Sequence, residues 1–506
     1  MKWIVNSEEM KYCDSNTITH FGVPSLVLME RAALSVAEQV LKKVPAKGSI
    51  LIVCGSGNNG ADGLAVARLL YQRGYEVTAA QIPDHGKRSP ENQLQRDILE
   101  KYGIDITEHI PSDRKYDCVI DALFGIGLSR APQGVYAEWI QVMNAACGYK
   151  IAIDMPSGVS SDDGRAYDPA FSADLTVTFA YQKVGQLLYP GCEKCGEILT
   201  AEIGITDAGW LERRPSCFIL EAEDTKRLPK RPPRSNKGTF GRVLAVAGSK
   251  NMAGAALFCA QAAYCTGCGL VKIYTEEANR VILQSALPEA ILSTYEETAN
   301  TKGSEEENDL QKSLADALNW ADVIIIGPGI GRSKQAHAAV EQVLKTADVP
   351  VVADADALNI LAENLSLLRS TSAKLILTPH PGEMARLCKK PIPEIQNTMR
   401  QTAEEFASQY HLVCVLKDAV TVTASASGTC LNTTGCSAMA KGGSGDVLTG
   451  VIAALAAQGM EPEEAARMGV YIHGLAGEEA ARQKGSYSVL ARDLIDGIGT
   501  VLSNIE

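Results

Sequence analysis

Apolar residues along the chain gather in short unbroken runs, each followed by a glycine-rich turn and then by a helical pattern. One such unit runs from 49–54 through GSGNNGADG (55–63) into a helical pattern at 64–73. Another runs from 243–247 through GSKNMAGAA (248–256) into a helix of small residues that ends at Gly267. Runs without alternation are typical of parallel strands covered on both faces. The same pattern predicts strands at 76–80, 118–121, 151–154, 175–179, 323–327, 351–354, 375–378 and 413–417.

A stretch of weak periodicity, 206–236, separates the two halves. It overlaps RLPKRPPRSNKG (227–238), and this clustering of proline and basic residues is typical of an interdomain linker. We place the boundary near residue 220 and predict two three-layer α/β domains, at 1–215 and 236–506, joined by a linker at 216–235. The acidic segment EETANTKGSEEEND (296–309) lacks large apolar residues and is predicted to be an exposed loop.

Charge and composition narrow the function classes. The 506 residues include 48 Lys and Arg against 60 Asp and Glu, a net charge of −12, which argues against nucleic-acid binding. No run of about 18 apolar residues and no signal-peptide pattern is present, so no membrane association is expected. The 14 cysteines are scattered, and the CxxC pairs at 192/195 and 265/268 adjoin no second pair or histidine cluster. We therefore expect free thiols in a reducing cytoplasm.

In the N-terminal half, polar residues stand where three predicted strands end. GSGNNGADG follows the first strand; a tight strand-to-helix turn is the plain interpretation, and a phosphate-binding turn the functional one. CVIDALFGIG places Asp121 at a strand end before a flexible glycine pair, and IAIDMPSGV ends in Asp154 before Ser157. Ligands of open parallel sheets bind at the carboxyl ends of strands. Asp121 and Asp154 are thus candidates to face a ligand at this edge of the sheet, and a helix cap before Pro156 is the alternative for Asp154.

In the C-terminal half, the strongest signal is AMAKGGSGDVLTGVIAAL (438–455). Its glycine-rich turn brings Asp446 to the start of an apolar helix, where free amides can hold a phosphate and the carboxylate can accept a hydroxyl proton. An N-capping aspartate is the alternative. His380 alone would be a structural turn residue, and Asp354 with Asp356 is either a metal pair or a helix cap. Four further loops accompany this turn, at 237–256, 327–331, 377–384 and 416–423.

Taken together, GSGNNGADG, DALFGIGL and IDMPSG closely resemble the epimerase domain of the bifunctional NAD(P)H-hydrate repair enzymes. The C-terminal motifs resemble the ADP-dependent dehydratase domain of the same family. The resemblance implies a Rossmann-like parallel sheet followed by a ribokinase-like domain. It also implies that the chain epimerises the R and S hydrates of NADH and NADPH (NADHX and NADPHX) at nicotinamide C6. The S form is then dehydrated to NAD(P)H at the expense of ADP.

The resemblance also implies residues for the epimerase site. Asp154 would be catalytic, and K⁺ would be held by Asn59, Asp121 and Ser157. Ala61 stands where the family usually has glycine, and Ile126 where it usually has threonine. The residues implied to contact the substrate are Asn58, Asn59, Gly60, Ala61, Asp62, Gly125, Ile126, Gly127, Leu128, Ser129, Arg130, Ala131, Tyr136 and Asp154.

For the dehydratase site, the resemblance implies that Asp446 is catalytic and contacts the hydrate together with Ala255, Gly331 and His380. Mg²⁺ is a further candidate, and the motifs do not distinguish ADP from ATP. Asp418 replaces the usual glycine after the lysine. The implied adenine-nucleotide residues are Lys417, Asp418, Ala419, Val420, Thr421 and Gly445.

Two alternatives compete with the repair enzyme. A small-molecule kinase of the hydroxymethylpyrimidine or pyridoxal type would share the glycine–aspartate turn, but it leaves the N-terminal half unexplained. A non-catalytic nucleotide-binding scaffold would have no use for a carboxylate in each crevice. We further expect a homo-oligomer. The small-residue helices at 253–263 and 448–457 are expected to pack close to the sheet, with an oligomer interface as the alternative.

Overall fold

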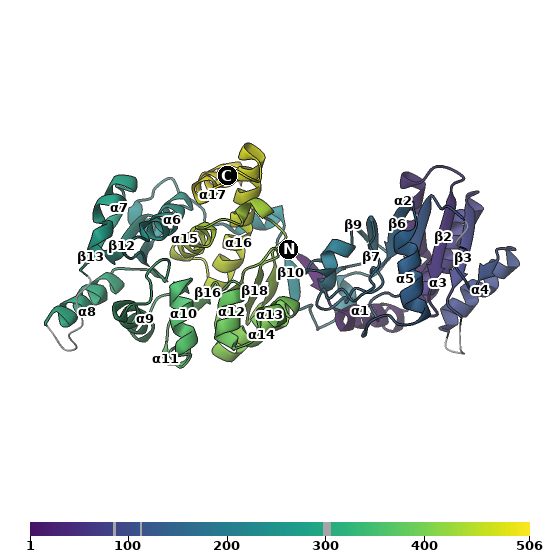
Figure 1. Ribbon diagram of the computed structural model, residues 1–506, viewed down its shortest axis with the longest axis horizontal. Coiled ribbons are helices and arrows are strands. Elements are labelled where there is room, and N and C mark those ends of the chain that lie inside the picture. The colour runs from purple at the N-terminus through teal and green to yellow at the C-terminus, as the bar shows by residue number, and fades with distance from the viewer. Residues whose placement is uncertain (84–87, 112–113, 297–304, 506) are drawn as a thin grey trace. The chain divides into compact units, whose positions relative to one another are not determined.

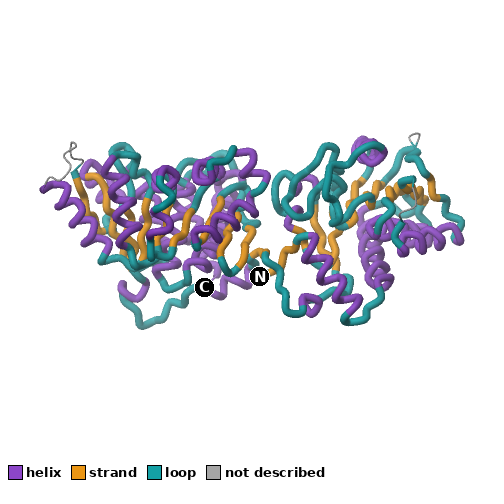
Figure 2. Tube along the Cα trace, turned by 90° about the horizontal axis from the view of Figure 1, so that it is seen from below, coloured by secondary structure: helices purple, strands orange, loops and turns teal. Residues whose placement is uncertain are grey.

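The computed structural model describes residues 1–83, 88–111, 114–296 and 305–505. The chain forms two compact units. Trp3–Cys217 is the first unit, and Met1–Lys2 together with Phe218–Glu506 is the second. In both, helices alternate with strands along the chain (Figures 1 and 2). From Phe218 on, the segment expected to be a linker lies within the second unit, and the division into 1–215, 216–235 and 236–506 stays a proposal about the functional domains.

The sheet of the first unit has the strand order β4-β3-β2-β5-β6-β7-β9, and each neighbouring pair is parallel. From β2 the chain first adds β3 and β4 on one side and then continues with β5 on the other side. The loops after β2 and β5 therefore lead in opposite directions and open a crevice at the carboxyl edge of the sheet. The strands are β2 (Ser49–Cys54), β3 (Glu76–Gln81), β4 (Ile106–Thr107), β5 (Cys118–Ala122), β6 (Tyr149–Ile153), β7 (Leu175–Phe179) and β9 (Glu197–Ala201), with β1 (Lys2–Val5) paired to β8 (Gln182–Lys183) outside this sheet.

Alternate residues of the central strand β2 enter two different cores. Ile50 and Ile52 pack with α2 and α3 on one face of the sheet, whereas Leu51 packs with Trp139 of α5 on the other. This explains why β2 is apolar throughout rather than alternating. The helices of the unit are α1 (Ser7–Thr19), α2 (Ser25–Lys43), α3 (Asn58–Gln72), α4 (Pro90–Lys101) and α5 (Val135–Ala145).

The second unit has a larger mixed sheet. Its strand order is β13-β12-β11-β14-β15-β16-β17-β18-β19, followed by β10, and the pairs from β13 to β17 are parallel. β18 and β19 continue it as antiparallel hairpin strands. The strands are β10 (Cys217–Ile219), β11 (Arg242–Val246), β12 (Leu270–Glu276), β13 (Ile291–Tyr295), β14 (Val323–Ile326), β15 (Val351–Ala353), β16 (Leu375–Leu377), β17 (Val413–Leu416), β18 (Val422–Ser425) and β19 (Gly428–Leu431).

Helices cover both faces of this sheet, with α6, α15 and α17 gathered on one side and α9, α10 and α12 on the other (Figure 1). The two small-residue helices pack against each other: a Cβ on Gly450 of α15 would stand 2.2 Å from the carbonyl oxygen of Cys259 in α6. The helices are α6 (Ala253–Cys265), α7 (Arg280–Ala286), α8 (Glu305–Leu318), α9 (Lys334–Thr346), α10 (Asp356–Glu363), α11 (Leu367–Ser370), α12 (Pro381–Cys388), α13 (Ile392–Asn397), α14 (Met399–Tyr410), α15 (Ser444–Ala457), α16 (Pro462–Lys484) and α17 (Ala491–Ile505).

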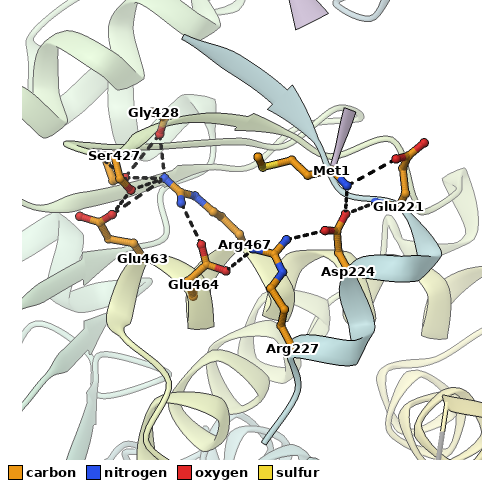
Figure 3. Close-up of polar contacts among 10 residues, drawn as sticks. Met1, Glu221, Asp224, Arg227, Ser427, Gly428, Glu463, Glu464 and Arg467 are labelled. Atoms are coloured by element: carbon orange, nitrogen blue, oxygen red, sulfur yellow. Dashed lines mark hydrogen bonds and ion pairs between the residues drawn. The ribbon is translucent and has the colours of Figure 1, made fainter. Parts of the chain in front are cut away.

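A polar network attaches the segment after β10 to the body of the second unit (Figure 3). Arg227, in a 3₁₀ helix at 222–227, pairs with Asp224 at 2.7 Å and with Glu464 of α16 at 3.0 Å. Arg467, one turn further along α16, pairs with the same Glu464 at 3.2 Å and donates to the carbonyl oxygen of Gly428 at 3.0 Å. The beginning of the expected linker is therefore an ordered part of this unit.

Two sequence expectations need correction. Six of the nine residues of the GSGNNGADG turn are helical, since α3 begins at Asn58 rather than at 64. The expected loop at 296–309 contains the start of α8 from Glu305, while 297–304 lie outside the described residues. The other predicted strands are present with ends shifted by one or two residues. Among the described residues, no helix is both long and apolar enough to cross a bilayer.

Candidate active sites

A cavity of about 550 Å³ lies at the carboxyl edge of the first unit's sheet. Its walls come from the loops after β2 and β5, from the ends of β6 and β7, and from the facing sides of α1 and α2. The wall is mixed, with apolar side chains beside several carboxylates and amides. The residues lining it include Met10, Lys11, Asp14, Leu28, Met29, Ala32, Asn58, Asn59, Asp62, Glu91, Phe124, Gly125, Ile126, Gly127, Tyr136, Asp154 and Lys183.

Asp154 is held in a strained and fully partnered position. It follows β6 with a φ of 64°, a left-handed conformation that costs free energy for a residue other than glycine. Its Oδ1 accepts hydrogen bonds from Lys183 Nζ and, at 3.1 Å, from Thr178 Oγ1. Gln186 donates to the backbone oxygen of Asp154 at 2.7 Å. The carboxylate is thereby fixed at the wall of the cavity.

Lys183 is the cation that pairs with Asp154. Its side chain is fully buried, and it donates to Phe179 O at 3.1 Å as well as to Asp154. Burial lowers the pKa of the ammonium, and the neighbouring carboxylate of Asp154 acts in the opposite direction. Breaking a buried pair of this kind by removing one partner typically costs about 3–5 kcal/mol.

Two further carboxyl groups share the cavity with Asp154. Burial raises the pKa of Asp62 well above its ordinary range, and the charges of Asp154 and Asp14 raise it further. Burial also raises the pKa of Asp14, again with a contribution from Asp154. Carboxyl groups held close together cannot all ionise, so this side of the cavity favours keeping a proton near Asp154.

Asp121 and Ser157 form a second cluster behind the glycine turn. The Asp121 carboxylate accepts from Ser157 N and Ser157 Oγ, both at 2.7 Å, and from Leu123 N at 3.1 Å. Burial raises the pKa of Asp121 to about 6, and these hydrogen bonds restrain the rise. Asn59 lies close by: a Cβ on Gly125 would be 3.1 Å from Asn59 Oδ1, and Asn59 Nδ2 is buried without a partner.

The structure brings most of the implied epimerase residues to this cavity but not all of them. Asn58, Asn59, Asp62, Gly125, Ile126, Gly127, Tyr136 and Asp154 line it. Gly60 and Ala61 are buried in the first turn of α3, so alanine at 61 needs no positive φ and fits. Leu128, Ser129, Arg130 and Ala131 lie in the following loop, outside the lining residues.

The site of the second unit is centred on Asp446 in the first turn of α15. Burial raises the pKa of Asp446 to about 7. The negative charge of nearby Asp354 raises the pKa further, and the positive charge of Lys417 acts in the opposite direction. Gly443, just before the helix, adopts a φ of 93°, where an added Cβ would meet Ala491 and Phe258 at 2.9 Å. Because Gly443 has no side chain, its position leaves the backbone amides of this turn uncovered.

Asp354 and Lys417 form a buried ion pair next to the turn. Lys417 Nζ lies 2.8 Å from Asp354 Oδ1, and Thr449 Oγ1 of α15 donates to Asp354 Oδ2 at 3.0 Å. Burial would raise the pKa of Asp354, but Lys417 and these hydrogen bonds outweigh it and lower the pKa. Gly445 lies against the pair, since its added Cβ would be 3.2 Å from Lys417 Nζ.

This arrangement corrects one expectation. The N-cap of α10 is Ala355, without a side-chain hydrogen bond, so neither Asp354 nor Asp356 caps that helix. Asp356 instead accepts from the backbone N–H of Gly331 at 2.9 Å. It therefore holds a loop that was implied to contact the substrate, while Asp354 fixes the lysine.

His380 caps α12 rather than standing alone. Its Nδ1 accepts from Gly382 N at 3.0 Å, and Glu383 Oε2 accepts from His380 N at 2.9 Å. Burial lowers the pKa of His380, with Lys417 and Arg386 adding to the effect. Burial raises the pKa of Glu383 to about 7, so a second carboxyl group near Lys417 titrates near neutrality.

The remaining implied residues surround this cluster. Ala255 lies in α6 with its Cβ 2.9 Å from the position of an added Cβ on Gly329, beside Gly331. Asp418 is exposed and accepts from the N–H of Ala419 at 2.8 Å, so its charge points to solvent. Val420 and Thr421 follow at the start of the β18 hairpin, where Thr421 O accepts from Asn432 N at 2.9 Å.

Sequence reasoning missed Lys183, Asp14, Glu383 and Thr449. Two of them carry a readable signal, because Glu383 stands three residues after His380, the spacing of a capping box, and Thr449 stands one helical turn after Gly445. Lys183 and Asp14 come from segments far from the glycine turn, and their convergence depends on the tertiary fold.

Comparison with known proteins places these two sites in one family. The family model described as NAD(P)H-hydrate dehydratase matches residues 243–499, and the YjeF-related protein N-terminus matches 25–185. The bifunctional NAD(P)H-hydrate repair enzyme Nnr of Moorella thermoacetica is 38% identical over 518 residues, covering all of this chain and 97% of the relative. The chain belongs to the family of bifunctional NAD(P)H-hydrate repair enzymes. The Nnr of Escherichia coli K12 is 33% identical over 95% of this chain and 90% of its own length.

The structural comparison agrees for the second unit. A ribokinase-like superfamily protein from Enterococcus faecalis has a TM-score of 0.50 at 27% identity and covers 57% of this chain and 96% of its own. The predicted fold class, α/β with parallel sheets and a ribokinase-like second domain, is confirmed. As a member of this family the chain is a two-activity enzyme, with epimerase and dehydratase domains, and the kinase alternative is not favoured.

Proposed function

We propose that the first unit interconverts the R and S hydrates of NADH and NADPH, and that the second unit dehydrates the S hydrate with consumption of ADP. The observation that carries the proposal is the presence, in each unit, of a carboxylate fixed at the carboxyl edge of a parallel sheet beside a glycine turn. Asp154 is that group in the first unit and Asp446 in the second.

Epimerisation needs a proton to be carried to and from the C6 hydroxyl. The lone pair of the ring nitrogen expels the hydroxyl as water once that oxygen is protonated, and water adds again from the opposite face with loss of the proton. Asp154 is the carrier that we assign, because it reaches the cavity while its Oδ1 is held by Lys183 and Thr178. Asp62 and Asp14, with raised pKa values, supply the same wall with exchangeable protons.

The oxygen cluster behind the glycine turn fits the K⁺ that the family implies. Asp121 is buried, accepts hydrogen bonds from Ser157 and forms no ion pair among the described residues, and Asn59 and Ser157 add a carbonyl and a hydroxyl oxygen close by. Neutral and anionic oxygens suit a weakly polarising monovalent cation. We propose that Asn59, Asp121 and Ser157 hold K⁺, which when bound would supply positive charge beside the dinucleotide phosphates.

For dehydration, the C6 hydroxyl oxygen attacks the β-phosphorus of ADP, the bond to AMP breaks, and Asp446 takes the hydroxyl proton. The phosphate ester then leaves as inorganic phosphate and the ring loses a proton from C5, which restores the double bond of NAD(P)H. Lys417 lies beside Gly445, where it can pair with the transferring phosphoryl group. Asp356 and Asp446 are the carboxylates that we propose to face Mg²⁺ if it accompanies the nucleotide.

The absorbance band of reduced nicotinamide tests both halves together. A mixture of R and S NADHX should recover this absorbance fully with ADP and the wild-type chain, at one AMP and one phosphate per hydrate. With Asp446→Asn no recovery is expected. Recovery without loss of ADP would contradict the phosphoryl-transfer step, and no recovery with either ADP or ATP would contradict the proposed activity.

Two broader expectations belong to the same proposal. We propose that the enzyme acts in the cytoplasm, where its substrates NADHX, NADPHX and ADP are present and its thiols stay reduced. We also propose that it forms a homo-oligomer. Neither depends on how the two sites carry out their chemistry.

A further inference from the structure

One face of α2 carries large apolar side chains that are exposed. Val27 is 48% exposed, and Leu34 and Leu41 are each 38% exposed. They are spaced by seven residues, so they follow one another along about 21 Å of the helix in a nearly straight line. The opposite face of α2 is buried and contributes Leu28 and Met29 to the cavity wall. The exposed line is therefore not needed to hold the helix in place.

Two opposite charges complete this line. Arg31 and Glu38 are exposed and fall between the three apolar residues within the same arc of about 80° of the helix. Arg31 uses one N–H group to reach the carbonyl oxygen of Glu202 at 3.3 Å, and the residue is otherwise exposed. The order along the helix is thus apolar, positive, apolar, negative, apolar, which we name the α2 stripe (Val27, Arg31, Leu34, Glu38, Leu41).

The α2 stripe is complementary to itself. When two copies are laid antiparallel about Leu34, Val27 of each copy faces Leu41 of the other, and Arg31 faces Glu38. A parallel pairing would instead place Arg31 against Arg31 and Glu38 against Glu38, which is repulsive. An isologous contact of this kind buries the exposed leucines and satisfies both charges twice.

We infer that the α2 stripe is the contact through which two copies of this chain associate. The inference rests on the proposed homo-oligomer and names the surface that forms it. A single helix pair buries less than the roughly 800 Å² per partner of a standard interface, so the association is expected to depend on concentration. Because α2 also walls the cavity, the pairing would brace that wall from outside.

Sedimentation velocity over about 1–100 μM protein tests the inference, since that range spans weak association. Leu34→Asp should halve the mass observed for the wild-type chain, or raise its dissociation constant at least tenfold. Leu94→Asp, at a residue 40% exposed on α4 of the same unit, is the matched control and should leave the mass unchanged. Circular dichroism confirms that both variants are folded.

Charge exchange gives the sharper result. Arg31→Glu and Glu38→Arg should each weaken association, because each puts like charges face to face. The double variant should restore it, and so should an equimolar mixture of the two single variants, which pairs Glu with Arg at both places. A wild-type oligomer that Leu34→Asp and both charge variants leave intact would overturn the α2 contact but not the homo-oligomer. A wild-type chain that stays monomeric throughout would overturn both, without bearing on catalysis.

Discussion

At the scale of residues, each site has a buried lysine–aspartate pair, but only in the first site does the pair include the working carboxylate. Lys183 bonds directly to Asp154, the proposed proton carrier of the first unit. Lys417 bonds instead to Asp354, and Asp446 stands nearby with a raised pKa. The first carboxylate is therefore held directly by its lysine, whereas the second has no direct lysine contact and has a pKa of about 7.

Replacing Lys183 tests the first arrangement. Lys183→Met should lower the free energy of unfolding by about 3 kcal/mol, because it leaves the buried Asp154 carboxylate without its cation. It should also slow the exchange between R and S hydrates, measured by chromatography of the two epimers. The double variant Asp154→Asn, Lys183→Met should recover much of the stability but none of the activity. If Lys183→Met still exchanged the two hydrates at the wild-type rate, the pair would be only structural.

The raised pKa of Asp446 should make activity and stability respond to rising pH in opposite directions. As a proton acceptor it must be ionised, so dehydration should rise with pH through about 7 and level off above it. Its pKa is higher in the folded chain than the ordinary 3.8, so the folded state loses stability as pH rises between these values. Asp446→Asn should lower the dehydration rate by about 10²–10⁴-fold. It should also stabilise the chain at pH 8 by about 1–2 kcal/mol and scarcely at pH 5, as measured by urea unfolding.

At the scale of elements, close helix packing positions the anion-binding turn. α15 carries Asp446 at its start and lies against α6 at Gly450, where the gap admits no side chain. Thr449, the residue before that glycine, bonds to Asp354 and thereby ties the same helix to the end of β15. The distance between α15 and α6 therefore sets where Asp446 stands.

Two helical glycines should respond in opposite directions. Gly450→Ala would place a Cβ 2.2 Å from the carbonyl oxygen of Cys259, so α15 must shift, and we expect a loss of about 2–3 kcal/mol with reduced dehydration. Gly254→Ala in α6 meets only Phe258 at 3.9 Å and should gain up to about 1 kcal/mol from helix propensity. Thermal unfolding of both variants measures the difference. Equal effects would mean that packing at Gly450 is loose.

Element positions were predictable because buried parallel strands have a plain pattern. The runs at 49–54 and 175–179 coincide with β2 and β7, and Asp121 and Asp154 stand at strand ends as expected. The start of α3 was not predictable, because asparagine and glycine at 58–60 favour turns locally and are helical here through tertiary contacts. The Lys183–Asp154 pair joins residues 29 positions apart and has no local signature.

At the scale of the whole molecule, the two sites are built from separate sets of residues. The first-unit cavity is lined by residues between Met10 and Ile205, and the Asp446 cluster draws on residues from Asp354 to Thr449. A substitution in one site should therefore leave the chemistry of the other unchanged. We expect the S hydrate to pass from one site to the other through solution.

Mixing two defective chains tests this independence. The Lys183→Met chain alone should restore NADH from the S hydrate but should convert the R hydrate only slowly. The Asp446→Asn chain alone should restore no NADH. An equimolar mixture should convert a mixture of both epimers completely, as followed by the reduced-nicotinamide absorbance. If the mixture stalls while the wild-type chain does not, transfer must occur within one chain.

The enclosure of Lys183 has a practical consequence for chemical labelling. Its side chain is fully buried, whereas that of Lys417 is 19% exposed. Amine-reactive reagents attack accessible, uncharged amines, so they should modify surface lysines first and spare the buried Lys183. Lys417 should react more slowly than the surface lysines, because its ion pair with Asp354 raises the pKa of its ammonium group. An enzyme coupled to a solid support through its amines should keep its ability to invert the hydrate, and any loss confined to the regeneration of NAD(P)H would trace to the more open lysine.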